Sequence, residues 1–123
     1  MSERKSIIKD KSFAFAVRIV RLYKHLCENK KEYVLSKQLL RSGTAVGALV
    51  REAQNAESIT DFLHKMKIAA KEVEETEYWL LICDNAKNYP PIADLLPTLN
   101  SIKKILAKII SSTKKKINES SNQ

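Results

Sequence analysis

Glycine and proline are scarce in this chain, and their scarcity restricts the fold more than any other feature of the sequence. Two glycines and three prolines are all that 123 residues contain, about 4% where globular proteins average ~12%. Turn-rich β-sandwiches and barrels need more of both, and no stretch alternates strictly enough for a strand. The length suits one core. The sequence therefore predicts a single all-α domain over residues 1–123.

Hydrophobic periodicity divides the chain into four helices. The predicted segments are Ser12–Glu28, Ser36–Asn55, Ser58–Lys87, and a fourth that begins near Asp94 or Leu96, passes Thr113 and frays over Asn118–Gln123. Pro90-Pro91 separates the last two segments, since proline cannot continue a helical ladder. The fourth has a seam at alternating steps of four and three, namely Leu95, Leu99, Ile102, Leu106 and Ile109. Short connectors predict an antiparallel up-down-up-down four-helix bundle.

Two of the helix starts carry capping signals. Ser36 is a suitable N-cap, with Leu35 and Leu40 placed as a hydrophobic staple around it. Ser58 and Asp61 have the spacing of a capping box. These residues are expected to satisfy backbone N–H groups in the first turns of the second and third helices.

Both glycines of the chain lie inside the second helix, where each costs about 1 kcal/mol relative to alanine. They are Gly43 and Gly47, one turn apart on one face. A compensating interaction is needed, so we expect another helix to pack closely against this flat surface.

The first helix is apolar around well over half of its circumference. Arg18, Arg21 and His25 form its only clean polar strip, and Lys24 lies at the margin. A helix on the side of a monomeric bundle needs an apolar stripe of little more than 100°. The excess predicts a closed homo-oligomer that buries this surface between subunits.

Charge is distributed unevenly around a net value of +8. Residues 1–51 hold twelve Lys/Arg against four acids, residues 52–94 hold four against nine, and residues 95–123 hold six against one. The basic segments suit a polyanion or an acidic partner. The candidate phosphate contacts are Arg18, Arg21, Lys24, Lys37, Arg41, Arg51, Lys103, Lys104, Lys108, Lys114, Lys115 and Lys116. The simpler alternative is a solvated charged face, but clustered Lys/Arg also supply sequence-independent affinity for nucleic acid.

Catalytic and metal-binding patterns are weak. Asp61-x-x-His64 is a lone half-match to the paired Glu-x-x-His motif of di-metal bundles. Cys27 and Cys83 are isolated and are expected to be reduced and half-buried. We therefore expect neither an enzyme nor a bound metal or cofactor.

Glu72 and Glu75 form the most suggestive pair of carboxylates, one turn apart on one face. They could raise one another's pKa as an acid/base pair does. The favoured alternative is that they pair with Lys71, Arg41 or Arg51 and fix the register of two helices.

The longest apolar run, Phe13 to Val17, is far below the ~20 residues that a membrane-spanning helix needs. No secretory leader pattern is evident. The expectation is a cytoplasmic protein that does not associate with a membrane.

The second and third helices resemble a known family, the bacterial four-helix-bundle proteins related to those encoded in intervening sequences of large-subunit ribosomal RNA genes. The resembling residues are Leu40 through Ala53 (LRSGTAVGALVREA), then Ala56-Glu57-Ser58, Asp61-Phe62, Lys65, Ile68-Ala69, Lys71-Glu72, Glu75-Thr76 and Tyr78-Trp79-Leu80. Leu49 departs from the pattern, because family members typically carry asparagine there.

The resemblance implies a ring-like homopentamer and a connection to nucleic acid, since a related branch assists retroelement reverse transcriptases by associating with the enzyme and its RNA. Together with the charge it gives one hypothesis: a non-enzymatic, oligomeric accessory protein that binds nucleic acid, structured RNA rather than DNA. The alternative is a protein-interaction scaffold that docks an acidic partner. Within an oligomer, Glu72, Glu74, Glu75 and Glu77 would then offer a complementary acidic surface.

Overall fold

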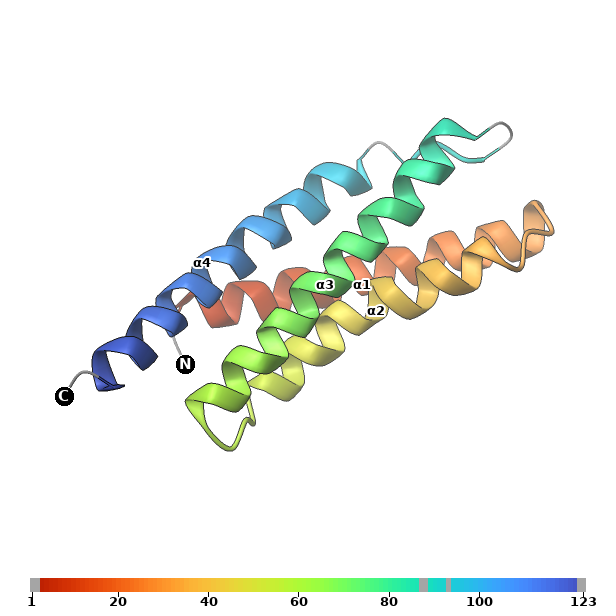
Figure 1. Cartoon of the computed structure of the whole chain (residues 1–123). Helices are drawn as coiled ribbons and strands as arrows, with labels where there is room; N and C mark the ends of the chain where they lie inside the picture. The colour runs from red at the N-terminus through yellow and green to blue at the C-terminus, as the bar shows by residue number, and fades with distance from the viewer. Residues whose placement is uncertain (1–2, 87–88, 93, 122–123) are drawn as a thin grey trace.

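Four long helices form an antiparallel up-down-up-down bundle in the computed structural model, as the periodicity predicts (Figure 1). The structure describes residues 3–86, 89–92 and 94–121, with the side chains of residues 3–6 excepted. The helices are α1 (Glu3–Asn29), α2 (Leu35–Ala53), α3 (Ile59–Asn85) and α4 (Leu95–Ser121). Contacts join α1 to α2, α2 to α3, α3 to α4 and α4 back to α1. Both the α1–α2 and the α3–α4 connections lie at one end of the bundle.

The core is aliphatic and takes a stripe from each helix. Phe15 is the largest of its fully buried side chains, and Ile19 and Leu26 follow it along α1. The predicted seam of α4 is confirmed, because Leu95, Leu99, Ile102, Leu106 and Ile109 are all buried. At about 0.8 kcal/mol per buried methylene, this core supplies the main force that holds the helices together.

The two glycines of α2 let α1 approach closely, as expected. A Cβ added to Gly43 would lie 2.8 Å from Cγ1 of Ile19, and one added to Gly47 would lie 3.2 Å from the backbone oxygen of Ser12. Real Cβ atoms are essentially never found at the first of these distances. The close packing of α1 on α2 therefore depends on the missing side chain at Gly43.

Helix α1 begins earlier than predicted, at Glu3 rather than near Ser12. Ser12 is fully buried inside the helix, and its hydroxyl donates to the backbone oxygen of Lys9 at 3.2 Å. Ile8, one turn earlier, is also fully buried. The apolar stripe therefore extends toward the N-terminus, and the serine that suggested a start is an interior residue with a satisfied hydroxyl.

The prediction that Ser36 caps α2 is wrong. The residue at the N-cap is Val34, without a side-chain capping bond, while Ser36 is buried within the first turn and its hydroxyl donates to the backbone oxygen of Glu32. The carboxylate of Glu32 accepts hydrogen bonds from the backbone N–H groups of Val34, Leu35 and Ser36 at 3.0, 2.9 and 2.7 Å. A negative charge at a helix N-terminus is also favoured by the helix dipole.

The N-cap predicted for α3 is confirmed, whereas the reciprocal bond to Asp61 comes from the residue before the cap. Ser58 is the N-cap, and its hydroxyl accepts from the Asp61 backbone N–H at 3.0 Å. The Asp61 carboxylate accepts in return from the backbone N–H of Glu57 and pairs with Lys65 at 2.8 Å. These interactions, the Lys65 hydrogen bond foremost, lower the pKa of Asp61. The predicted end at Lys87 lies outside the described residues, and the helix itself ends at Asn85.

Helix α4 begins at Leu95, between the two predicted starts, and Pro97 lies in its first turn as expected. The helix continues to Ser121 and so includes residues 118–121 of the stretch for which a frayed tail was predicted. Lysine is a good helix former and neither glycine nor proline follows Pro97, so nothing in this stretch ends the helix. The Ser121 hydroxyl donates back to the carbonyl of Ile117.

No helix in the described part of the chain is long and apolar enough to span a membrane.

Candidate nucleic-acid interface

Arg41 binds two glutamates of α3 from its place on α2. Its guanidinium lies 3.1 Å from the Glu72 carboxylate and also pairs with Glu75. The Trp79 indole N–H donates to the same Glu75 carboxylate at 3.1 Å. That hydrogen bond, followed by the one from Arg41, lowers the pKa of Glu75. The predicted pairing of Glu72 and Glu75 with Arg41 is confirmed, and this arginine joins two helices.

Two more of the predicted phosphate contacts are engaged in ion pairs. Arg18 lies 2.7 Å from the Asp94 carboxylate and donates to the Thr98 hydroxyl at 3.1 Å. Lys103 lies 2.9 Å from Glu74 and 3.6 Å from Glu77, and the Glu74 hydrogen bond is the largest cause of its raised pKa. Nucleic acid would have to compete with carboxylates of the same chain for these cations.

Three of the predicted phosphate contacts, Arg18, Arg41 and Arg51, do not share one strip of the bundle surface. Arg18 reaches α4, Arg41 reaches α3, and Arg51 lies over the Phe13 ring of α1 with its guanidinium carbon 5.7 Å from the ring centroid. Arg18 is on α1, and the ten positions from Arg41 to Arg51 at 100° each place these two side chains about 80° apart around α2. The sequence indicated the partners of Arg41 but not those of Arg18 and Arg51.

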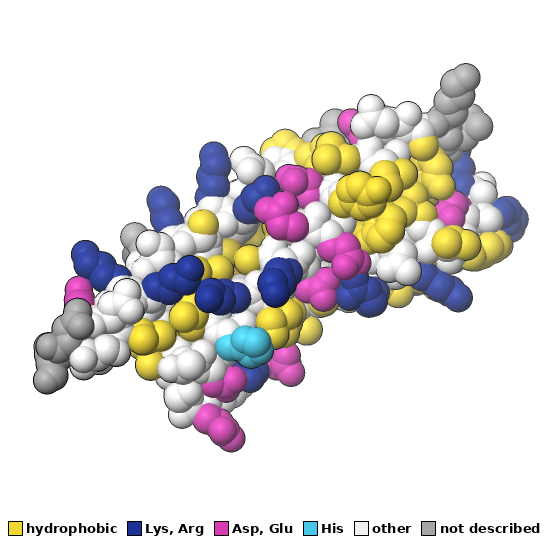
Figure 2. Space-filling view, in the orientation of Figure 1, with side chains coloured by type: hydrophobic (Ala, Val, Ile, Leu, Met, Phe, Trp, Pro, Cys, Tyr) yellow, Lys and Arg dark blue, Asp and Glu magenta, His cyan; other side chains and the backbone are white. Residues whose placement is uncertain are grey.

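Nine of the twelve predicted contacts form no ion pair with any described residue: Arg21, Lys24, Lys37, Arg51, Lys104, Lys108, Lys114, Lys115 and Lys116. All nine are exposed. Five of them lie on α4, and Figure 2 shows Lys and Arg side chains spread over the half of the molecule that holds its C-terminal end. Helix α4 is therefore a basic helix whose lysines, apart from Lys103, are exposed and form no ion pair with a described residue.

The α4 lysines surround the helix instead of forming a flat face. Lys104, Lys108 and Lys115 point away from the bundle at positions separated by four and seven residues. Lys114 lines a hollow between α3 and α4, whereas Lys116 lines another beside the α2–α3 turn. The arrangement suits contacts to a phosphate backbone that curves around the helix end.

The sequence analysis missed the role of Glu32 at the start of α2 and the hollow between α3 and α4. Glu32 is four residues before Ser36, so an acidic residue just outside a helix start was the available signal. The sequence feature that could have indicated the hollow is weaker: two small residues, Ala70 and Ala107, on helices that pack against each other in the fold.

Potential catalytic groups are dispersed. No three His, Cys, Asp or Glu residues come together as a metal site within the described ranges. Both cysteines are free thiols, Cys27 half-buried and Cys83 buried. Burial raises the pKa of Cys83 to about 11, so that its thiol is protonated and unreactive at neutral pH.

Fold and surface together define an all-α four-helix bundle with a basic C-terminal helix. The sequence model of the 23S rRNA-intervening sequence protein family matches residues 4–119. The chain belongs to this family.

A solved structure supports the assignment. It is titled a protein with unknown function from the S23 ribosomal protein family from Bacteroides thetaiotaomicron VPI-5482, is 47% identical to this chain, and superposes with a TM-score of 0.81 over 88% of this chain and 98% of its own. Among curated proteins none matches this chain.

Proposed function

We propose that this protein is a non-enzymatic, oligomeric accessory factor that binds structured RNA through the phosphate backbone. The observation that carries the proposal is the set of five exposed α4 lysines without ion pairs to described residues: Lys104, Lys108, Lys114, Lys115 and Lys116. Their charges are not neutralised by a neighbouring carboxylate. Membership of a family named after an rRNA intervening sequence favours RNA as the polyanion.

A salt series tests the proposal directly. An RNA hairpin and a DNA duplex of matched sequence are titrated with protein at ionic strengths between about 50 and 200 mM, where proteins with several phosphate contacts lose orders of magnitude in affinity. Replacing the five α4 lysines by glutamine is expected to lower the salt slope by about one per lysine that contacts phosphate. The matched control replaces five other exposed lysines, Lys11, Lys30, Lys31, Lys67 and Lys71. No RNA binding even at low salt, or equal losses in both variants, would refute the proposal.

Oligomerisation is the second part of the proposal, with the number of five subunits taken from the family resemblance. It is supported by apolar side chains of α1 that the bundle leaves in solvent, with Phe13 at 59% and Val20 at 37% exposure. Light scattering at micromolar concentration is expected to give a multiple of the monomer mass. The Phe13→Ser variant is expected to have a lower mass in the same measurement. Tyr33→Ser, at an exposed aromatic residue of the α1–α2 connection, is the control. A monomer mass for the unaltered protein would contradict this part.

The acidic surface that α3 was expected to offer to a second copy within an oligomer is not supported. Glu72 and Glu75 pair with Arg41, and Glu74 and Glu77 pair with Lys103 of the same chain. These four carboxylates are therefore already engaged within one subunit.

A further inference from the structure

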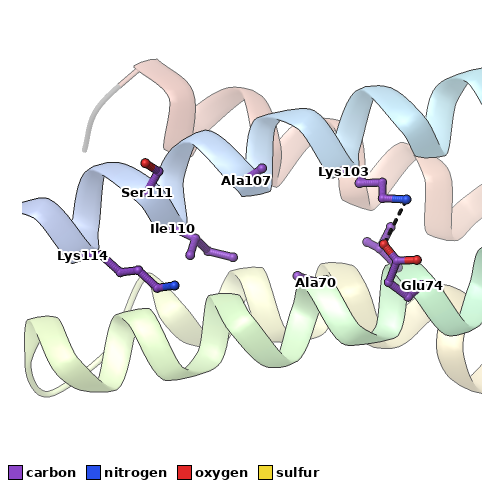
Figure 3. Close-up of a pocket in the computed structure, with 8 residues that line it drawn as sticks. Ala70, Glu74, Lys103, Ala107, Ile110, Ser111 and Lys114 are labelled. Carbon is purple, nitrogen blue, oxygen red and sulfur yellow. Dashed lines mark ion pairs between the residues drawn. The ribbon is translucent and has the colours of Figure 1, made fainter.

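A groove of about 420 Å³ lies between α3 and α4 (Figure 3). Its lining consists of Ala70, Val73 and Glu74 from α3 with Lys103, Ala107, Ile110, Ser111 and Lys114 from α4. The two alanines leave the hollow open because their side chains end at a methyl group. Ile110 points from α4 toward α3 and forms part of an aliphatic floor.

The two ends of the groove differ electrostatically. At one end Lys103 is held by Glu74 and Glu77. At the other, Lys114 points toward α3, is exposed, and forms no ion pair with any described residue. The only carboxylate in the lining is therefore neutralised, and the free charge of the groove is positive.

The size and lining of the groove fit a helix. Lys103 and Lys114 are eleven positions apart, roughly 16 Å along the axis at 1.5 Å per residue, which corresponds to three turns of a partner helix. A helix that lies in a groove presents apolar anchors at i, i+3 or i+4, and i+7. Complementarity to Lys114, and to Lys104 and Lys108 on the adjoining face of α4, requires acidic residues beside these anchors.

We propose that the α3–α4 groove docks an acidic amphipathic helix of a partner protein, with aliphatic anchors over Ala70, Ala107 and Ile110 and a carboxylate at Lys114. A second copy of this chain is disfavoured, because the glutamates clustered on α3 are engaged with Arg41 and Lys103. RNA is disfavoured in the groove itself, since no aromatic side chain lines it for base stacking. This docking site does not depend on the proposed RNA binding.

Two designed peptides of about 18 residues, or five helical turns, test the proposal. Both carry leucines at the anchor spacing, flanked by glutamates in one and by lysines in the other. Fluorescence anisotropy is expected to show binding of the acidic peptide and at least about tenfold weaker binding of the basic one, a difference of ~1.4 kcal/mol.

Two variants of the full chain locate the site. Ala107→Tyr fills the groove at an exposed position and is expected to weaken acidic-peptide binding at least about tenfold. The control is Ala14→Tyr, the same change at an exposed alanine of α1, which is expected to leave peptide binding unchanged. Lys114→Gln is expected to weaken binding about threefold, as loss of one exposed charge pair does. Lys30→Gln, at an exposed lysine beyond the end of α1, is its control. Circular dichroism checks that each variant remains helical.

Two results would overturn the docking site. The first is no binding of the acidic peptide at millimolar concentration, and the second is equal binding by the Ala107→Tyr variant. If that variant binds the peptide equally but has impaired RNA binding or a lower oligomer mass, the groove is a binding site for nucleic acid or for a second copy instead. Failure of RNA binding alone leaves the peptide results unaffected, so the two proposals fail separately.

Discussion

Helices α2 and α4 occupy opposite corners of the bundle and contact their neighbours in different ways. On α2, Gly43 has no room for a Cβ beside Ile19. The Ser42 hydroxyl makes a buried polar contact with the Thr76 hydroxyl of α3, and Arg41 pairs with Glu72 at the surface. On α4 the contacts come mainly from a repeating aliphatic seam, and the lysines outside it, apart from the ion-paired Lys103, project into solvent. Specific contacts thus concentrate on α2, while α4 keeps a surface available for binding.

The largest expected effect comes from adding atoms at Gly43. Gly43→Leu would place side-chain atoms where Ile19 already lies, and overpacking of this kind typically costs about 1–3 kcal/mol. We expect a loss near the top of that range in the free energy of unfolding, measured by urea denaturation, despite the better helix propensity of leucine. Ala107→Leu, the corresponding change on the exposed side of α4, is expected to stay within about 0.5 kcal/mol. Equal losses in the free energy of unfolding at both positions would show that α2 and α4 do not differ in their tolerance of added side-chain atoms.

An intermediate effect is expected at Thr76. Its hydroxyl lies 2.9 Å from the Ser42 hydroxyl and 2.7 Å from the Glu72 carbonyl, and both side chains are fully buried. Thr76→Val leaves Ser42 without this partner, so a loss of about 1–2 kcal/mol is expected in the same measurement. Adding Ser42→Ala to that variant should restore part of the loss, because an unpaired buried hydroxyl is then removed. Strictly additive losses would show that the two hydroxyls do not interact.

Sequence predicted best those features that depend on short-range spacing. The seam from Leu95 to Ile109, the Ser58 capping box and the close approach at Gly43 each follow from a local pattern with one physical explanation. Ser12 and Ser36 show where such patterns fail. A serine at an apparent helix start can be an N-cap or a buried interior residue with a satisfied hydroxyl, and the choice depends on tertiary packing.

The candidate interface was less predictable than the fold, for a related reason. Composition identified the basic residues, but their availability depends on which carboxylates the fold brings near them. Arg18 and Asp94 are 76 residues apart in sequence, and Arg41 and Glu72 are 31 apart. The groove at Ala107 is likewise a property of two helices together, which no single-helix pattern specifies.

Acid should weaken the α2–α3 contact more than the α4 seam. The Trp79 indole and Arg41 lower the pKa of Glu75 below its usual 4.5, so the unfolded chain binds more protons in acid. The stability from this group is therefore fully present above pH 4.5 and is lost as the pH falls through the folded-state pKa. Glu75→Gln is expected to make the acid-side loss shallower by less than about 1 kcal/mol, because the site is partly exposed.

Urea denaturation between pH 7 and pH 3 measures this difference. Glu28→Gln, at an exposed glutamate of α1 without an ion pair to the described residues, is the control and should follow the unaltered protein. If the free energy of unfolding of Glu75→Gln has the same pH dependence as that of the unaltered protein, the contacts of Glu75 with Arg41 and Trp79 contribute nothing to acid sensitivity.

The smallest expected effect on folding is at the C-terminal lysines of α4. Lys114, Lys115 and Lys116 are exposed and form no ion pair with a described residue, so replacing them with glutamine removes no contact that holds the bundle. None of them lies in the last turn of α4, where a cation is stabilised by the helix dipole. The triple variant should therefore unfold within about 0.5 kcal/mol of the unaltered protein. A larger loss in urea denaturation would mean that this end of α4 helps to hold the fold, and the functional separation between α2 and α4 would then fail.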